Sequence, residues 1–130
     1  MRGTGRRTPR LRGAGITCAQ ARRAARHLLS ETDMGPERAG DVLTVVSELV
    51  ANAHRHAGGV TGFRITPLPG AVVVEVSDAS FHLPHRRPWS AVGRGGFGWL
   101  LVKRLAITVT VRCDHHGKTI TALLTAEPPP

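Results

Sequence analysis

Cysteine is scarce in this chain of 130 residues, and long apolar runs are absent. The two cysteines, Cys18 and Cys113, are too few for a disulfide framework and favour a reducing, cytoplasmic location. No apolar run approaches the ~20 residues needed to cross a bilayer. The arginines near the N-terminus are followed by no apolar segment, so we expect no signal peptide. These absences argue against a secreted disulfide scaffold and against a helical membrane protein.

Aromatic and acidic side chains are also few. Aromatic residues make up 4% of the chain, with no tyrosine, and 9 acidic residues stand against 18 basic ones, for a formal net charge of +9. A positive charge of this size suits nucleic acid, an acidic protein or a polyphosphate ligand. Base stacking needs aromatic rings, however, and the basic residues are scattered beyond the N-terminal segment. Direct nucleic-acid binding is therefore the least favoured of these alternatives.

The sequence does contain enough apolar material for one folded domain. Hydrophobic residues make up 41% of the chain, and a chain of this length buries roughly two thirds of its unfolded surface. Residues 1–15 are rich in Arg, Gly and Thr without periodicity, which predicts a basic, disordered arm. We expect the domain to span residues 16–126 and residues 127–130 to form a tail.

Two helices are predicted in the first half of the domain. Thr17 and Gln20 form a capping box, and apolar residues recur at helical spacing from there to about Ser30. Pro36 suits the first position of a second, longer helix, which Gly58 and the glycine after it should end. The predicted buried stripe of this helix consists of Val42, Val45, Val46, Leu49, Val50 and Ala53.

The period changes from helical to alternating after residue 59. We expect strands at residues 60–66, 71–76, 107–113 and 118–126, a helix at 97–106 and a long loop at 79–94. A loop of that length in a small domain usually serves a function. Hairpins with helices between them predict an α+β two-layer sandwich, with a mixed, largely antiparallel sheet and about three helices on one face.

The segment GRGGFG fits the dinucleotide-binding pattern G-x-G-x-x-G at Gly93, Gly95 and Gly98. That fingerprint has to follow a buried strand directly, whereas the residues before Gly93 show no strand pattern, so NAD binding is not expected. A glycine loop that opens a helix still makes an anion site, because its free backbone N–H groups lie at the positive end of the helix dipole. The alternative is a flexible loop end without a ligand.

Several polar residues stand out within the apolar segments. Glu48 and Asn52 are four residues apart, so both side chains lie on one face of the second helix, which His56 continues. They form either a satisfied core pair or a site in which Glu48 acts as a base and the Asn52 carboxamide oxygen binds Mg²⁺. Asp78 ends a predicted strand, where it either caps a turn or contacts a ligand.

Three segments together resemble one protein family in order and spacing. ELVANAHRHA resembles the N box of the GHKL ATPases, the Bergerat-fold superfamily of histidine kinases, gyrase B and Hsp90. VEVSDAS resembles the first glycine box, and GRGGFGWLLVKRLA resembles the second. The small size and the ending GKTITALL are most similar to the anti-sigma-factor serine/threonine kinases in their actinobacterial regulatory form. The resemblance covers roughly residues 17–126 and implies the Bergerat ATP-binding fold.

The resemblance implies a role for each residue at a matching position. Glu48 matches the glutamate that acts as general base or orients water, and Asn52 matches the asparagine that ligates Mg²⁺. Asp78 matches the aspartate that accepts a hydrogen bond from the adenine amino group. Thr119 matches a threonine that helps to hold adenine beside that aspartate. His56 matches a histidine common at the end of the N box in this branch.

The long loop and its glycines match the part of the family that encloses the nucleotide. Residues 79–96 match the ATP lid. The glycines that match those wrapping the phosphates are Gly93, Gly95, Gly96 and Gly98. Arg94 lies within this glycine run, and its charge and position indicate a contact with a phosphate. Ser80 replaces the glycine of the first glycine box, and its Cβ restricts the backbone near adenine.

The resemblance implies a cytoplasmic regulatory protein that binds ATP and Mg²⁺. As a serine/threonine kinase it would phosphorylate a small antagonist protein and bind a sigma factor, and members of the family commonly form homodimers. Ser80 keeps a second interpretation open, an ATP-binding regulatory module without kinase turnover. A third, a basic nucleic-acid-binding protein, rests on the net charge and predicts binding with a steep salt dependence.

Overall fold

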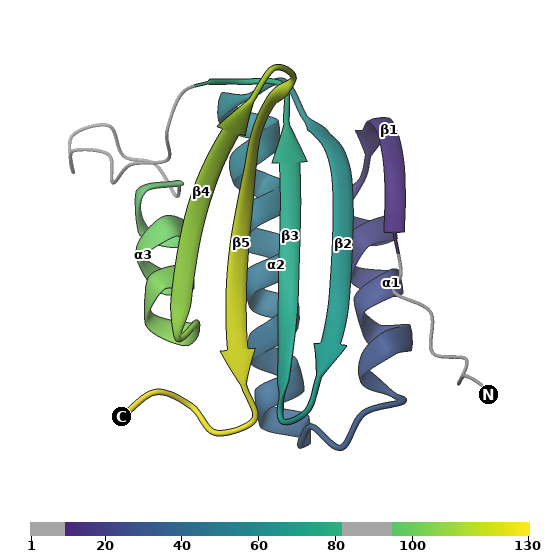
Figure 1. Ribbon diagram of the computed structural model, residues 1–130, viewed down its shortest axis with the longest axis vertical. Helices are drawn as coiled ribbons and strands as arrows, with labels where there is room; N and C mark the ends of the chain where they lie inside the picture. Colours follow the sequence, from purple (N-terminus) through teal and green to yellow (C-terminus); the bar gives the residue numbers. More distant parts are fainter. Residues whose placement is uncertain (1–9, 82–94) are drawn as a thin grey trace.

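The computed structural model describes residues 10–81 and 95–130, and of residues 14 and 95–97 it describes the backbone alone. This part of the chain forms two layers, a five-stranded sheet with three helices against one face (Figure 1). The elements are β1 (Arg10–Ile16), α1 (Cys18–Leu29), α2 (Pro36–His56), β2 (Val60–Leu68), β3 (Ala71–Asp78), α3 (Gly95–Leu105), β4 (Thr108–Asp114) and β5 (Gly117–Thr125).

The strand order is β1-β2-β3-β5-β4, and each neighbouring pair is antiparallel. The predicted α+β two-layer sandwich is therefore confirmed, with antiparallel pairing throughout the described strands where a mixed sheet was expected. Within the same part of the chain, no helix is long and apolar enough to span a bilayer.

Both helices of the first half form where they were predicted. The Oγ1 of Thr17 accepts from the Gln20 N–H at 3.1 Å, and the Thr17 N–H donates to Gln20 Oε1 at 2.9 Å, which completes the capping box of α1. α2 ends just before Gly58 and Gly59, whose φ angles of 76° and 117° favour glycine. All six residues of the predicted α2 stripe are buried in the core.

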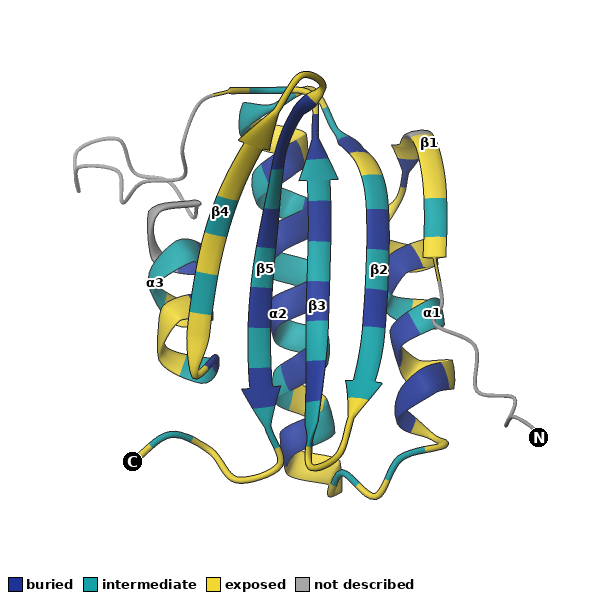
Figure 2. Ribbon diagram, in the orientation of Figure 1, coloured by how far each residue is buried: buried dark blue, intermediate teal, exposed yellow. Residues whose placement is uncertain are grey.

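One face of the sheet packs on the helices and the other is open. In β3, Val72, Val74 and Val76 are buried and the residues between them are half-buried, the alternation of a strand covered on one side (Figure 2). Each fully buried side chain of this size stabilises the fold by about 1.5–3 kcal/mol. α2 lies behind the middle of the sheet, between α1 and α3 (Figure 1).

Strand β1 lies where the sequence predicted a disordered arm at residues 1–15. It pairs with β2, so that Leu11 stands opposite Phe63. The strand escaped prediction because Gly13 has a φ of 103° and the pairing register shifts along the strand. Such an irregular edge strand shows no two-residue alternation in its sequence. Residues 10–15 therefore belong to the sheet and not to a disordered arm, and residues 1–9 lie outside the described residues.

A buried arginine, Arg38, joins three elements at the start of α2. Its side chain is 5% exposed, and its Nε donates to the carbonyl of Thr125 at 2.7 Å. Its Nη2 donates to the carbonyl of Leu105 at 2.8 Å, and its Nη1 pairs with the Asp41 carboxylate at 3.0 Å. These bonds connect the beginning of α2 to the ends of α3 and β5.

Candidate functional site

The predicted site segments meet near one end of the sandwich. β3 ends at Asp78, which pairs with Val60, the first residue of β2, and α2 ends just before that residue. The start of β5 pairs with the same end of β3, at the upper end of Figure 1. The last turns of α2, the end of β3 and the start of β5 are therefore neighbours.

The first turn of α3 reaches this region through a close contact between Gly98 and Glu48 of α2. A Cβ atom placed on Gly98 would overlap the Glu48 carboxylate oxygen Oε1. Gly98 is buried and Glu48 is half-buried. Only a residue without a side chain lets the α3 backbone lie this close to the carboxylate. The structure thus brings the predicted base against the predicted phosphate-binding turn.

Asn52 and His56 continue the face of α2 that carries Glu48, and both are half-buried. Within residues 10–81 and 95–130, the Asn52 carboxamide makes no hydrogen bond, so its oxygen has capacity for a ligand. Mg²⁺ takes oxygen ligands and needs only one or two from the protein when phosphates supply others. The residues present therefore fit Mg²⁺. His54 belongs to another face, because its Nε2 lies 3.1 Å from the carbonyl of Ile16.

Asp78 forms a buried ion pair with Lys118. The two residues are 3% and 4% exposed, and the Lys118 Nζ lies 3.0 Å from Asp78 Oδ1 and 2.9 Å from Oδ2. The backbone N–H of Ser80 also donates to Oδ1, at 2.9 Å. The Asp78 carboxylate therefore caps the turn after β3 and holds a cation at the same time.

The β4–β5 hairpin fixes the partner of Asp78 through Gly117. This glycine has a φ of 141°, and a Cβ atom on it would overlap the carbonyl oxygen of Asp78. Both the φ and the space require glycine. The close fit supports the register in which Lys118 stands directly opposite Asp78.

Thr119, which was predicted to lie beside Asp78, is not brought there. Ser77 stands opposite Thr119 in the pairing of β3 with β5, and the two hydroxyl oxygens are 2.7 Å apart. Because strand side chains alternate between faces, Thr119 lies on the open face and Lys118 on the helix face. Lys118 was missed, although its position has the same parity as the apolar, buried residues of β5. That parity is the signal that could have revealed it.

Part of the predicted glycine cradle lies outside the described residues. Gly93 and Arg94 belong to that part, as does most of the predicted ATP lid. α3 begins at Gly95, and Gly96 follows in its first turn. Gly98 lies against another predicted site residue, Glu48.

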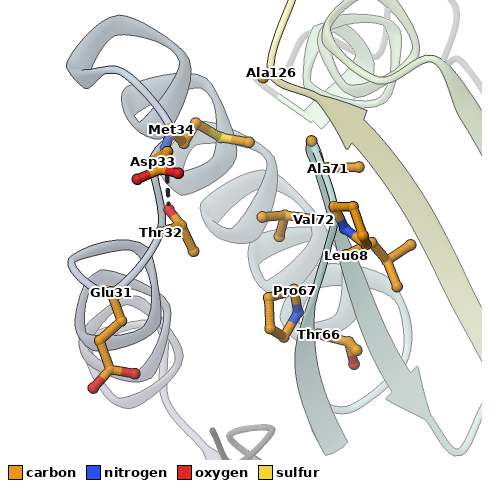
Figure 3. A pocket seen from close by; sticks show the side chains of 12 residues that line it. Glu31, Thr32, Asp33, Met34, Thr66, Pro67, Leu68, Ala71, Val72 and Ala126 are labelled. Atoms are coloured by element: carbon orange, nitrogen blue, oxygen red, sulfur yellow. Dashed lines mark hydrogen bonds between the residues drawn. The ribbon is translucent and has the colours of Figure 1, made fainter. Parts of the chain in front are cut away.

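A surface hollow of about 520 Å³ lies at the other end of the sheet (Figure 3). The connection between α1 and α2 and the β2–β3 hairpin form its walls, including Met34 and Leu68. Its β3 residue Ala71 is at the start of the strand, about 23 Å from Asp78 at ~3.3 Å per residue. This hollow therefore belongs to a different region from the predicted site.

A second hollow, of about 570 Å³, lies on the open face over β1, β2 and β3. Desolvation, and after it the positive charges of Arg12 and Arg64, lower the pKa of Arg10 in its wall. An arginine pKa starts so far above neutrality that the group stays charged. Of the predicted site residues, Thr119 lines this hollow.

The fold is that of the class that the sequence motifs indicated, the ATP-binding α+β sandwich of the GHKL ATPases. Residues 15–124 match the family model described as the histidine kinase-like ATPase domain, and the chain belongs to this family. Membership implies an ATP-binding domain. No curated protein matches the sequence.

The solved structures that share the fold include the following two. One contains the RsbU and RsbW domains of Rv1364c from Mycobacterium tuberculosis, with a TM-score of 0.63 and 19% identity over 95% of this chain and 33% of that one. The other is the histidine kinase domain of the blue-light activated histidine kinase EL346 from Erythrobacter litoralis, with a TM-score of 0.53 and 21% identity over 84% and 60% of the two chains. This chain thus spans a third to three fifths of those structures.

Proposed function

We propose that this protein is a Mg-ATP-dependent regulator of the anti-sigma-factor serine/threonine kinase type. It transfers the γ-phosphate of ATP to a serine or threonine of a small antagonist protein and binds a sigma factor. Family membership supports the ATP-binding part. The three boxes in the sequence and the fold similarity to a structure with an RsbW domain support the branch. A cytoplasmic location and a homodimer belong to the same proposal.

The contact between Glu48 and Gly98 is the observation that carries the proposal. It places a half-buried carboxylate beside the N-terminal turn of α3, where free backbone N–H groups favour phosphate. The Glu48 carboxylate accepts the proton of the attacking serine or threonine hydroxyl. The hydroxyl oxygen bonds to the γ-phosphorus of ATP, and ADP leaves. The N–H groups stabilise the charge on the transferred group.

The other predicted site residues bind and orient the nucleotide in this proposal. Asn52 ligates Mg²⁺, which when bound neutralises charge on the phosphates, and His56 lies one turn beyond it. Asp78 accepts a hydrogen bond from the adenine amino group. Gly93, Gly95, Gly96 and Gly98 surround the phosphates, and Arg94 contacts one of them. Thr119 faces away from Asp78, so its proposed role at adenine passes to Lys118.

Replacing Glu48 by glutamine tests the kinase mechanism. The glutamine keeps the shape of the side chain but cannot accept the hydroxyl proton, so phosphate transfer should fall by 10²–10⁴-fold. Transfer of labelled γ-phosphate to candidate antagonist proteins from the same genome measures this loss. Calorimetric titration with Mg-ATP should show a dissociation constant within a few-fold of the wild-type value. Equal transfer by the two proteins would contradict the assignment of Glu48 as the base.

A second candidate function is an ATP-binding regulatory module without turnover. One observation favours it: Ser80 replaces a glycine of the first glycine box. Under this alternative, Glu48→Gln leaves the regulatory effect on a partner protein unchanged. The titration and the transfer assay together separate the two functions, since only the kinase loses output with the variant.

A further inference from the structure

The ion pair between Asp78 and Lys118 offers two kinds of hydrogen-bonding group in one place. The carboxylate of Asp78 only accepts hydrogen bonds, and the ammonium of Lys118 only donates them. The two side chains are 1% and 3% exposed. Hydrogen bonds to charged groups in such surroundings are strong and costly to leave unmade.

The remaining capacity of the pair can be located from its bonds. Asp78 Oδ1 already accepts from the Ser80 N–H and from Lys118, whereas Oδ2 accepts from Lys118 alone. A carboxylate oxygen accepts about two hydrogen bonds, so Oδ2 can take one more. The ammonium has three N–H bonds and can donate to a further acceptor. A ligand edge with one donor and one acceptor side by side would match both.

Purine bases present such edges in two forms. The edge of adenine has an amino donor beside the ring acceptor N1, and the edge of a 6-oxopurine has the carbonyl acceptor O6 beside the N1–H donor. A carboxylate without a cation repels O6 and therefore favours adenine. Because the Lys118 ammonium lies 2.9–3.0 Å from the Asp78 carboxylate oxygens, a donor is also available to the O6 carbonyl oxygen of a 6-oxopurine.

We infer that Lys118 broadens the base selectivity of the site, so that 6-oxopurine nucleotides such as GTP bind as well as ATP. This inference rests on the proposed function, because it takes Asp78 as the group that contacts the base. Lys118 is then a specificity-determining residue. A site with desolvated polar groups discriminates strongly against ligands that leave those groups unpaired. Removal of the Lys118 ammonium therefore changes the selectivity between purine bases by a large factor.

Calorimetric titration of the full chain with Mg-ATP and Mg-GTP tests the inference. For the wild type we expect the dissociation constant of GTP to lie within tenfold of that of ATP. In Lys118→Met the donor is lost, and the ratio of the GTP constant to the ATP constant should rise at least tenfold. Lys118→Gln keeps an N–H donor on a side chain one bond shorter, and its ratio should stay closer to that of the wild type than to that of Lys118→Met.

The possible results separate the inference from the proposed function. Wild-type protein that binds ATP but binds GTP more than tenfold more weakly overturns the inference and leaves ATP binding intact. An unchanged ratio in Lys118→Met also overturns it. If neither nucleotide binds at millimolar concentration, the proposed function itself is wrong. Should Lys118→Met fail to fold, the wild-type ratio still decides.

Discussion

Two glycines shape the candidate site, and their neighbours differ in how far they can move. Gly98 lies against the end of the Glu48 side chain, which can rotate away. Gly117 lies against the backbone of Asp78, which is fixed in the sheet, and it also has a φ of 141°. An added methyl group therefore displaces a side chain at the first position and strains the fold at the second.

Gly98→Ala should strongly reduce phosphate transfer while preserving the stability of the fold. The new Cβ displaces the Glu48 carboxylate, so phosphate transfer should fall by about 10²-fold or more. Alanine favours a helix over glycine by up to about 1 kcal/mol, which offsets the displacement in the free energy of unfolding. Transfer assays and urea unfolding measure the two effects.

Gly40→Ala provides the matched control, because Gly40 is also helical and a Cβ there meets nothing within 4 Å. It should stabilise the protein by roughly 0.5–1 kcal/mol without changing transfer. Equal transfer by the Gly98→Ala and Gly40→Ala variants would show that the contact with Glu48 has no role in catalysis.

Gly117→Ala should affect stability first. Its positive φ and its contact with the Asp78 carbonyl should together lower the free energy of unfolding by about 2–4 kcal/mol. Urea unfolding monitored by circular dichroism measures the loss. A loss below about 1 kcal/mol would mean that the start of β5 shifts easily, and then the register opposite Asp78 would not be fixed by this glycine.

At the scale of elements, α2 links the core to the site. One face of this helix supplies the buried valines and Leu49, and another carries Glu48 and Asn52. Its first turn is held by Arg38, which bonds to the ends of α3 and β5. Gly98 belongs to α3. The position of the first turn of α3 relative to Glu48 of α2 therefore depends on how firmly these two helices are joined.

Arg38→Ala should destabilise the protein by about 3 kcal/mol. It leaves two carbonyl groups, those of the half-buried residues Thr125 and Leu105, without their donor. Urea unfolding measures the change. Arg23→Ala is the control, because Arg23 is an exposed residue of α1 and its loss should change the free energy by less than about 0.5 kcal/mol. Equal effects would show that the bonds of Arg38 contribute nothing.

At the scale of the whole molecule, the sandwich brings together segments that are far apart in the sequence. Glu48 lies on a helix, Asp78 at the end of a strand thirty residues later, and Gly98 on another helix twenty residues beyond that. The antiparallel sheet adds the start of β5 to the same end. A ligand that contacts all of them stabilises the folded state as a unit, since the unfolded chain has no such site.

Binding of ATP with Mg²⁺ should therefore raise the unfolding temperature. At a ligand concentration about 100 times the dissociation constant, the stabilisation is about 2.7 kcal/mol. Thermal unfolding with and without the nucleotide measures it. Removing Mg²⁺ with a chelator should reduce the shift, and Asp78→Asn should reduce it further. No shift at millimolar ATP in the wild type would contradict nucleotide binding.

The helices and most strands were predictable because their signals are local. Thr17 and Gln20 cap α1 within one turn, and the stripe of α2 repeats with the helical period. The contact of Glu48 with Gly98 agrees with the order of the three boxes in the sequence, although neither segment specifies the other's position. β1 was not predictable, since its glycines and shifted register remove the alternation by which strands are found.

The sequence by itself determined the helices and four of the five described strands, the family and the residue types available for chemistry, because periodicity, caps and motifs act over a few neighbouring residues. The tertiary structure alone decided that Lys118 rather than Thr119 meets Asp78. Which of two adjacent residues faces the helices depends on strand register, and a shift of one residue reverses every side chain. That register is set by pairing between strands forty residues apart and by the close fit of Gly117.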